Sequence, residues 1–193
     1  MKSFLKSALH WFSLFAIFPF AFLSGFGRFE PIYLIGAHCL GLVPGLPGDY
    51  LRSAWYRMTL EKCSPQSRIQ FGSFFAHPQA RVGEGVYIGS YCVLGRTLIG
   101  DRTQIASGVQ ILSGSRQHRR DDNGKILGSE EGIFTTVSIG SDCWIGAGAI
   151  VMADVGSGTT VGAGSVVTAP VPPGSVAVGN PARVIKSLND RLT

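Results

Sequence analysis

The sequence has few charged residues for a soluble protein. Asp, Glu, Lys and Arg together make up 15% of the 193 residues, whereas typical soluble domains contain about 25%. The net charge of +5 is small and scattered along the chain, which disfavours a nucleic acid as a partner. A chain so poor in charge either buries much of its surface against partners or contacts lipid.

Cysteine and histidine are also scarce, with four residues of each. The cysteines lack the CxxC spacing of a metal site and the close, regular spacing of a disulfide framework. The sequence therefore predicts no metal ion, and reduced thiols agree with a cytoplasmic location.

The chain divides into two parts of different composition. Eight of the 12 Phe lie in the first 30 residues, and 19 of the 26 Gly lie from Gly83 onward. An apolar fraction of 45% excludes a disordered linker. The glycines do not recur at every third position, which excludes collagen. The two parts therefore need separate explanations.

Residues 1–62 are expected to form a hydrophobic and amphipathic helical region for membrane association. Residues 7–27 contain no charged side chain, and as a helix they would span about 31 Å, close to the thickness of a bilayer core. Pro19 is expected to kink this helix. A second uncharged stretch covers residues 31–48, but its helical part should end near Val43, which makes it too short to cross a bilayer.

Three interpretations of this region stay open: a cleaved signal peptide, a hydrophobic helix packed on a soluble protein, and membrane attachment. We favour membrane attachment, because Lys2, Lys6, Arg52 and Arg57 would then lie on one side, which the positive-inside rule makes cytoplasmic. Trp55 beside basic residues also suits an anionic membrane surface. The expected location is the cytoplasmic face of the inner (plasma) membrane; whether the segment spans, re-enters or lies on the membrane is open.

An aliphatic or aromatic residue recurs about every six positions in the rest of the chain, usually followed by Gly or Ala. A period of six fits neither a helix nor a half-buried strand; it is typical of a parallel β-helix, in which three hexads form a coil of about 18 residues. About 14 hexads predict four to five coils. The recurring residues are Ile69, Phe75, Val82, Ile88, Leu94, Ile99, Ile105, Ile111, Ile139, Ile145, Val151, Val155, Val161 and Val167.

The repeat is interrupted after Ile111 and resumes at Ile139. A regular coil has no room for residues 112–138, which are therefore predicted to form an extruded loop. Polar residues that gather on a loop of a rigid scaffold indicate a functional site. They are Arg116, His118, Arg119, Arg120, Asp121, Asp122, Lys125, Glu130 and Glu131.

The repeat region resembles the hexapeptide-repeat acyltransferases, in particular the sugar and surface-polysaccharide O-acetyltransferases. Residues 138–149, 161–168 and 172–185 carry the resemblance, and the Gly-Asn-Pro-Ala-Arg ending at 179–183 is its most specific part. The resemblance implies a left-handed parallel β-helix over residues 63–185 and a short helix or tail over 186–193. It also implies a homotrimer with acetyl-CoA, as co-substrate, bound between adjacent subunits.

The resemblance also assigns candidate acetyl-CoA contacts. Ala147 and Ala163 match positions whose backbone N–H groups meet the thioester and the pantetheine arm. Thr168 lies farther along that groove. Arg183 and Lys186 match cationic residues near the nucleotide phosphates. The segment between Val151 and Val161 is two residues shorter than the common pattern, which loosens the correspondence there.

His118 matches the catalytic histidine of the family on the extruded loop. A thioester is already activated, so an acceptor hydroxyl can attack it directly if a base and oxyanion donors are present. Histidine is the natural base near neutral pH. Arg116, Asp121 and Asp122 are candidates for acceptor binding; the two acids could equally form turns. Trp144 is expected to pack at a coil corner.

The sequence thus predicts a membrane-associated O-acetyltransferase that moves an acetyl group to a sugar hydroxyl of a surface polysaccharide or lipid-linked glycan. One alternative is an acyltransferase for a small-molecule acceptor, such as an amine or an antibiotic. Another is a non-catalytic trimeric membrane scaffold. A zinc hydrolyase would need three histidine ligands, and only His77 and His118 lie in the repeat region.

Overall fold

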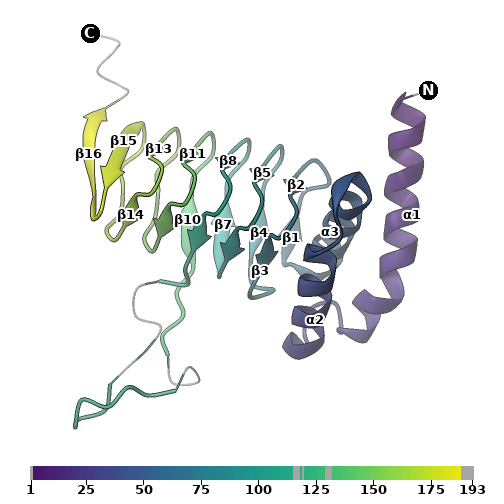
Figure 1. Cartoon of the computed structure of the whole chain (residues 1–193), viewed down its shortest axis with the longest axis horizontal. Coiled ribbons are helices and arrows are strands. Elements are labelled where there is room, and N and C mark those ends of the chain that lie inside the picture. The colour runs from purple at the N-terminus through teal and green to yellow at the C-terminus, as the bar shows by residue number, and fades with distance from the viewer. Residues whose placement is uncertain (1, 115–117, 119, 129–131, 188–193) are drawn as a thin grey trace.

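Three helices stand at one end of a three-sided prism built from short strands (Figure 1). The computed structural model describes residues 2–114, 118, 120–128 and 132–187. The helices are α1 (Lys2–Leu23), α2 (Glu30–Gly41) and α3 (Gly45–Thr59). The fold confirms the expected β-helix with a helical region before it.

Each side of the prism is one sheet. Sheet A contains β1 (Lys62–Cys63), β4 (Arg81–Val82), β7 (Thr97–Ile99) and β10 (Val137–Ile139). Sheet B contains β2 (Arg68–Ile69), β5 (Tyr87–Ile88), β8 (Gln104–Ile105), β11 (Trp144–Ile145), β13 (Thr160–Val161), β15 (Ser175–Gly179) and β16 (Ala182–Ser187). Sheet C contains β3 (Phe74–Phe75), β6 (Val93–Leu94), β9 (Gln110–Ile111), β12 (Ile150–Val151) and β14 (Val166–Val167).

The six-residue period corresponds to side chains stacked inside the prism. Neighbouring coils pair in parallel and in register, so that Ile88 lies beside Ile105, and Ile105 beside Ile145. All three side chains are fully buried. Sheet B has six parallel strands in the described part of the chain, one for each turn. The expected four to five coils were therefore too few, because β15 extends the stack past the last hexad that the sequence pattern revealed.

Glycine at the coil corners lets successive turns approach closely. A Cβ atom on Gly146 would collide with the backbone nitrogen of Ala163 and lie 2.7 Å from the carbonyl carbon of Gly162. Only a residue without a side chain fits this contact without a shift of the next coil.

Strand β16 includes the first two residues of the segment 186–193, which was expected to form a short helix or tail. Lys186 and Ser187 end this strand, which pairs antiparallel with β15. The turn at Gly179–Pro181 sends the chain back along the last edge of sheet B. Strand β16 therefore covers backbone groups of β15 that an unpaired edge strand would expose. Residues 188–193 lie outside the described residues.

Arg52 joins the helices to the first coil, which corrects its expected place at a membrane surface. Its side chain is 0% exposed. Nε donates a hydrogen bond to the Ile69 carbonyl at 2.9 Å, and Nη1 donates to the carbonyls of Leu40 and Val43. Nη2 forms a 2.7 Å ion pair with Asp49. Burial lowers the pKa of this guanidinium from its usual value, and Asp49 acts in the opposite direction.

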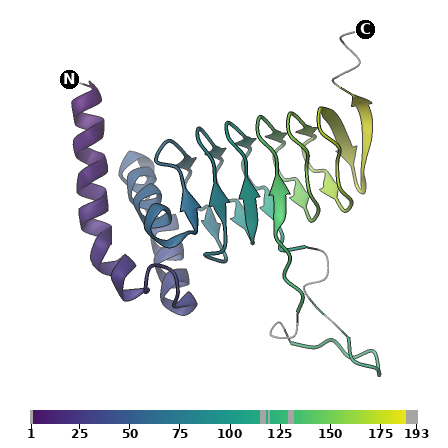
Figure 2. The same ribbon diagram turned by 180° about the vertical axis from the view of Figure 1, so that it is seen from behind.

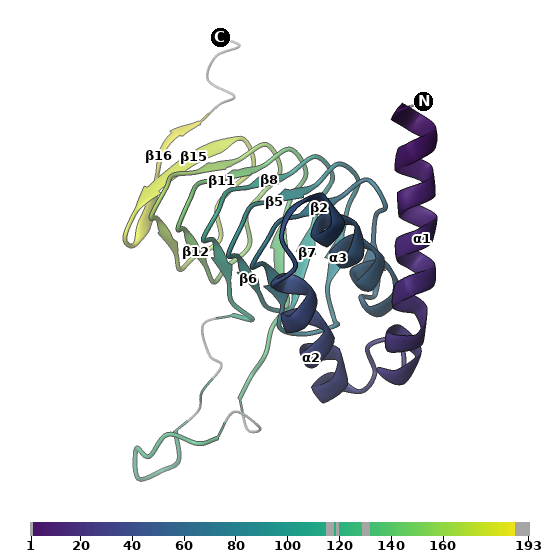
Figure 3. The same cartoon turned by 45° about the vertical axis from the view of Figure 1, so that its right-hand side comes forward.

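Helix α1 carries no charged residue after Lys6 but buries only one stripe. Ser13, Ile17 and Ala21 are buried, and α1 packs against α3 (Figure 3). The rest of the helix exposes large side chains, with Phe15 82% exposed. The helix assignment continues through Pro19. None of the helices in the described part of the chain combines the length and the hydropathy that a membrane span requires.

Candidate active site

The extruded loop leaves the prism after β9 and returns at β10, and it projects away from the strands (Figures 1 and 2). Contacts hold the first and last residues of the loop against the prism. The Thr135 N–H donates a hydrogen bond to the Ser113 carbonyl at 2.9 Å. The Phe134 ring lies 5.5 Å, between centroids, from the ring of His77, and the Arg96 guanidinium lies 5.5 Å from the Phe134 centroid. A loop fixed at both ends can present side chains at a defined distance from the prism.

His118 is exposed on this loop, and no hydrogen bond joins it to another described residue. Asp122 is exposed as well. Arg116 lies outside the described residues. His118 is thus accessible to solvent or to a neighbouring molecule, and the part of its own chain that the structure describes supplies no orienting partner.

Asp121 forms a turn within the loop. Its Oδ1 accepts hydrogen bonds from the N–H groups of Asn123 and Lys125, both at 2.9 Å. Its own N–H donates to the Lys125 carbonyl at 2.9 Å. This is the turn-forming role of a loop acid, which occupies the oxygen that would otherwise be free for a substrate.

Ala147 and Ala163 lie one above the other at the edge between sheets B and C. The Gly164 N–H donates a hydrogen bond to the Ala147 carbonyl at 2.8 Å, which connects the two coils. The N–H groups of Ala147 and Ala163 donate to no described residue. A Cβ atom on Gly148 or Gly164 would meet nothing within 4 Å. The edge therefore offers unpaired backbone donors beside open, narrow surface.

The β15–β16 hairpin continues this edge at the end of the prism. The Gly179 N–H donates a hydrogen bond to Ser165 Oγ at 3.1 Å, so the turn of the hairpin lies beside the corner that contains Ala163. Arg183 and Lys186 are exposed on β16. Thr168 is also exposed, but it follows β14 and lies at the next corner of the same coil.

One chain brings Ala147, Ala163 and Arg183 together, but it separates these predicted acetyl-CoA contacts from Thr168 and from the loop that carries the predicted base. Ala147, Ala163 and Arg183 follow the edge between sheets B and C, whereas the loop that carries His118 leaves from the edge between sheets C and A. The two groups of site residues therefore belong to different edges of the prism in one chain.

Trp144 was missed as a candidate surface residue. It does not pack at a corner: its side chain is 60% exposed on the outer face of β11, three residues before Ala147. The signal was present in the sequence, because strand residues alternate between faces and Trp144 directly precedes the buried Ile145.

No group of three His, Cys, Asp or Glu side chains in the described residues could hold a metal ion. The arrangement is thus an exposed histidine on a fixed loop and a row of backbone donors that ends at cationic side chains.

Comparison with known proteins agrees with the repeat architecture. Residues 136–169 match the family model "Bacterial transferase hexapeptide (six repeats)". The crystal structure of a maltose O-acetyltransferase from Clostridium difficile 630 aligns with a TM-score of 0.69 at 27% identity, covering 82% of this chain and 86% of that one. The repeat region is therefore similar to the hexapeptide-repeat transferases in both sequence and fold.

Two relatives each match more than half of this chain. Nodulation protein L from Rhizobium leguminosarum bv. viciae is 51% identical over 109 residues, which cover 54% of this chain and 55% of that protein. Serine acetyltransferase 2 from Arabidopsis thaliana is 35% identical over 135 residues, which cover 65% of this chain and 36% of that protein. The chain thus spans about half or less of the length of these relatives.

Proposed function

We propose that this chain is an acetyl-CoA-dependent O-acetyltransferase that acts on a sugar hydroxyl of a surface polysaccharide or lipid-linked glycan. The observation that carries the proposal is the exposed His118 on a loop fixed to a prism whose edge presents the unpaired N–H groups of Ala147 and Ala163. The structural similarity to a maltose O-acetyltransferase supports a sugar acceptor.

The reaction needs only one proton carrier. The acceptor hydroxyl attacks the thioester carbonyl while the His118 imidazole takes its proton. Backbone N–H groups at the sheet B–C edge stabilise the negative charge on the carbonyl oxygen. The carbon–sulfur bond then breaks, the acetyl group stays on the acceptor, and the imidazolium returns the proton to the CoA thiolate.

The sheet B–C edge suits the shape of CoA. The pantetheine arm is narrow and contains amides, which can pair with the Ala147 and Ala163 N–H groups over the open surface of Gly148 and Gly164. Arg183 lies at the far end of this row, where its guanidinium can pair with the nucleotide phosphates. Lys186 on the same strand adds a second positive charge.

A homotrimer would complete the site. In it, the loop of one copy places His118 over the sheet B–C edge of its neighbour, which joins the base and the acetyl-CoA contacts that a single chain keeps apart. The exposed Trp144 lies close to that edge and can pack against a neighbouring subunit or the bound substrate.

The exposed aromatic face of α1 supports attachment at the cytoplasmic face of the inner membrane. A soluble monomer rarely exposes so large a continuous apolar patch, and each Phe that leaves water contributes about 1.5–3 kcal/mol. A membrane-held enzyme meets a lipid-linked glycan at the surface where that acceptor is anchored. The face includes Trp11, Phe12, Phe15, Phe18 and Phe22.

A small-molecule acceptor is the second candidate, and the similarity to serine acetyltransferase 2 favours it. Acceptor-dependent release of CoA distinguishes the two. The full chain, purified in detergent with acetyl-CoA, should release CoA with oligosaccharides or lipid-linked sugars and not with serine or simple amines. Release of CoA with serine alone would show that the acceptor is an amino acid and not a sugar. If the chain binds no acetyl-CoA, the non-catalytic scaffold replaces the enzyme.

A further inference from the structure

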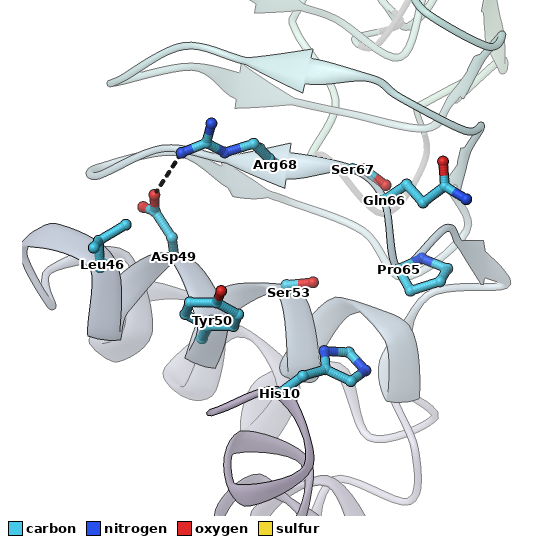
Figure 4. A pocket seen from close by; sticks show the side chains of 9 residues that line it. All are labelled: His10, Leu46, Asp49, Tyr50, Ser53, Pro65, Gln66, Ser67 and Arg68. Carbon is cyan, nitrogen blue, oxygen red and sulfur yellow. Dashed lines mark ion pairs between the residues drawn. The ribbon is translucent and has the colours of Figure 1, made fainter. Parts of the chain in front are cut away.

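Two adjoining cavities lie at the helical end of the molecule, at the opposite end of the prism from the β15–β16 hairpin. The first has a volume of about 320 Å³, and most of the residues that line it have polar side chains; they come from α1, α3 and the segment before and within β2 (Figure 4). The second has a volume of about 160 Å³ and lies between α1 and α3. Leu46 and Tyr50 line both cavities, which makes them neighbours.

The two cavities differ in chemistry. The larger contains His10, Ser53, Gln66 and Arg68. In the smaller, all lining residues except Ser13 and Tyr50 have apolar side chains, and Phe12 connects it to the exposed aromatic face of α1. A polar chamber that opens beside an apolar one fits an amphiphile better than a free sugar or a purely apolar ligand.

Arg68 supplies a positive charge to the larger cavity. Asp49 is its only carboxylate among the described lining residues, and Asp49 is already paired with the buried Arg52 at 2.7 Å. Its second oxygen accepts a hydrogen bond from Gln70 at 3.0 Å. The Arg68 guanidinium lies 3.7 Å from the same oxygen and keeps 61% of its side chain exposed, so most of its donors remain available.

Hydroxyl donors converge on the same space. The Tyr50 and Ser53 side chains make no hydrogen bond to another described residue, although Ser53 is almost fully buried. His10 is held beside Arg57, and burial together with this guanidinium lowers its pKa. The lowered pKa favours the neutral imidazole, so His10 adds no further positive charge near pH 7.

We propose that these cavities form a binding site for a phosphate-bearing lipid, with the phosphate beside Arg68, Tyr50 and Ser53 and the start of the chain in the apolar cavity. The lipid tail would continue over the aromatic face of α1 into the bilayer. This inference deepens the proposed membrane attachment and rests on it, and it is independent of the acetyl-transfer chemistry. The site would hold the end of the prism against anionic lipid or against the phosphate of a lipid-linked acceptor.

Binding of a water-soluble short-chain lipid tests the site without a membrane. The full chain is titrated calorimetrically with dihexanoyl phosphatidic acid below its micelle-forming concentration. Arg68→Gln should weaken binding about tenfold, because a hydrogen bond to a charged group is lost. Arg81→Gln is the matched control: Arg81 is also 61% exposed, pairs with Glu61 and lies on β4 away from both cavities. It should leave the affinity within about twofold of the wild type.

Two further ligands separate the sources of affinity. Glycerol 3-phosphate, which lacks chains, and dihexanoyl phosphatidylcholine, whose headgroup is neutral overall, should both bind more weakly than the phosphatidic acid. Equal affinity for glycerol 3-phosphate would make this a phosphate site and overturn the lipid. Unchanged binding by Arg68→Gln, or equal losses in Arg68→Gln and Arg81→Gln, would overturn the site.

A second variant and a vesicle assay keep the inference separate from the proposed function. Ser53→Leu fills the polar cavity and should abolish short-chain lipid binding; if it does not fold, Arg68→Gln alone decides. Arg68→Gln should release CoA with a soluble acceptor at the wild-type rate. A wild-type chain that binds the lipid but transfers no acetyl group would refute the enzyme and leave the lipid site standing. A chain that transfers acetyl but binds neither the short-chain lipid nor anionic vesicles would refute the lipid site and leave the enzyme standing.

Discussion

The guanidinium of Arg52 donates a hydrogen bond from Nε to the carbonyl of Ile69 at 2.9 Å, across the boundary between helix α3 and the first coil of the prism. Through its other nitrogens the same side chain holds the end of α2 and the carboxylate of Asp49. One buried cation therefore fixes the relative position of the helices and the repeat domain.

Replacement of Arg52 should destabilise the chain strongly. Arg52→Ala leaves several buried carbonyls and the Asp49 carboxylate without their donor, and the loss of one partner from a buried pair costs about 3–5 kcal/mol. Urea unfolding followed by circular dichroism measures this loss. The exposed Arg81–Glu61 pair provides the control, since Arg81→Ala should cost at most about 1 kcal/mol. Equal costs for the two variants would contradict the role of Arg52.

Gly146 should tolerate no side chain. Gly146→Ala places a methyl group against the Ala163 backbone, so that the coils must move apart at a cost of about 1–3 kcal/mol. Thermal unfolding measures it. Gly128→Ala serves as the control, because its Cβ would meet nothing within 4 Å, and it should change stability by less than about 0.5 kcal/mol. A thermal midpoint as high in Gly146→Ala as in the control would refute the close contact.

The repeat could be predicted from the sequence because the residues that define each hexad lie within six consecutive positions. An inward aliphatic residue such as Ile88 and the glycine after it are neighbours in the chain, so the pattern needs no knowledge of distant contacts. Because the prediction relied on this local pattern alone, the predicted number of coils was too small. In β15 the inward residues are Ser175 and Ala177, which do not continue the aliphatic pattern, although they are buried in the last turn.

The role of Arg52 could not be predicted in this way. Its partners are backbone carbonyls 9 to 17 residues away, and an arginine on an amphipathic stretch looks the same whether its helix faces lipid or the prism. The candidate site was partly accessible: the interruption of the repeat identified the loop, but the edge from which it leaves depends on how the coils stack. The sequence therefore indicated candidate residues for the site, which stay a prediction, and it did not indicate their separation within one chain.

The cysteines should differ in reactivity. Burial raises the pKa of the Cys63 thiol to about 11, so that only about one molecule in a thousand carries the thiolate at pH 8. Cys39 is exposed on α2. Iodoacetamide in detergent at pH 8 should label Cys39 first, and labelling of Cys63 should accelerate as the pH approaches 11. Mass spectrometry of the labelled peptides identifies the sites. Equal rates at pH 8 would contradict the burial of Cys63.

Arg183 should recognise the nucleotide part of CoA. Arg183→Ala removes a charge-assisted contact worth about 1.5–3 kcal/mol and should raise the KM for acetyl-CoA about tenfold or more, with little change in kcat. Acetyl-pantetheine lacks the nucleotide phosphates, and with this donor the variant should match the wild type. The same loss with both donors would place Arg183 away from the phosphates.

The central claim is that His118 is the base for acetyl transfer, and CoA release by the His118→Ala variant tests it most directly. The account predicts that kcat falls about 10²- to 10⁴-fold, while the Kd for acetyl-CoA stays unchanged because backbone N–H groups and Arg183, and not His118, hold the donor. His38→Gln, on helix α2 and in contact with Phe74, should keep the wild-type rate. A His118→Ala enzyme that releases CoA as fast as the wild type would contradict the account.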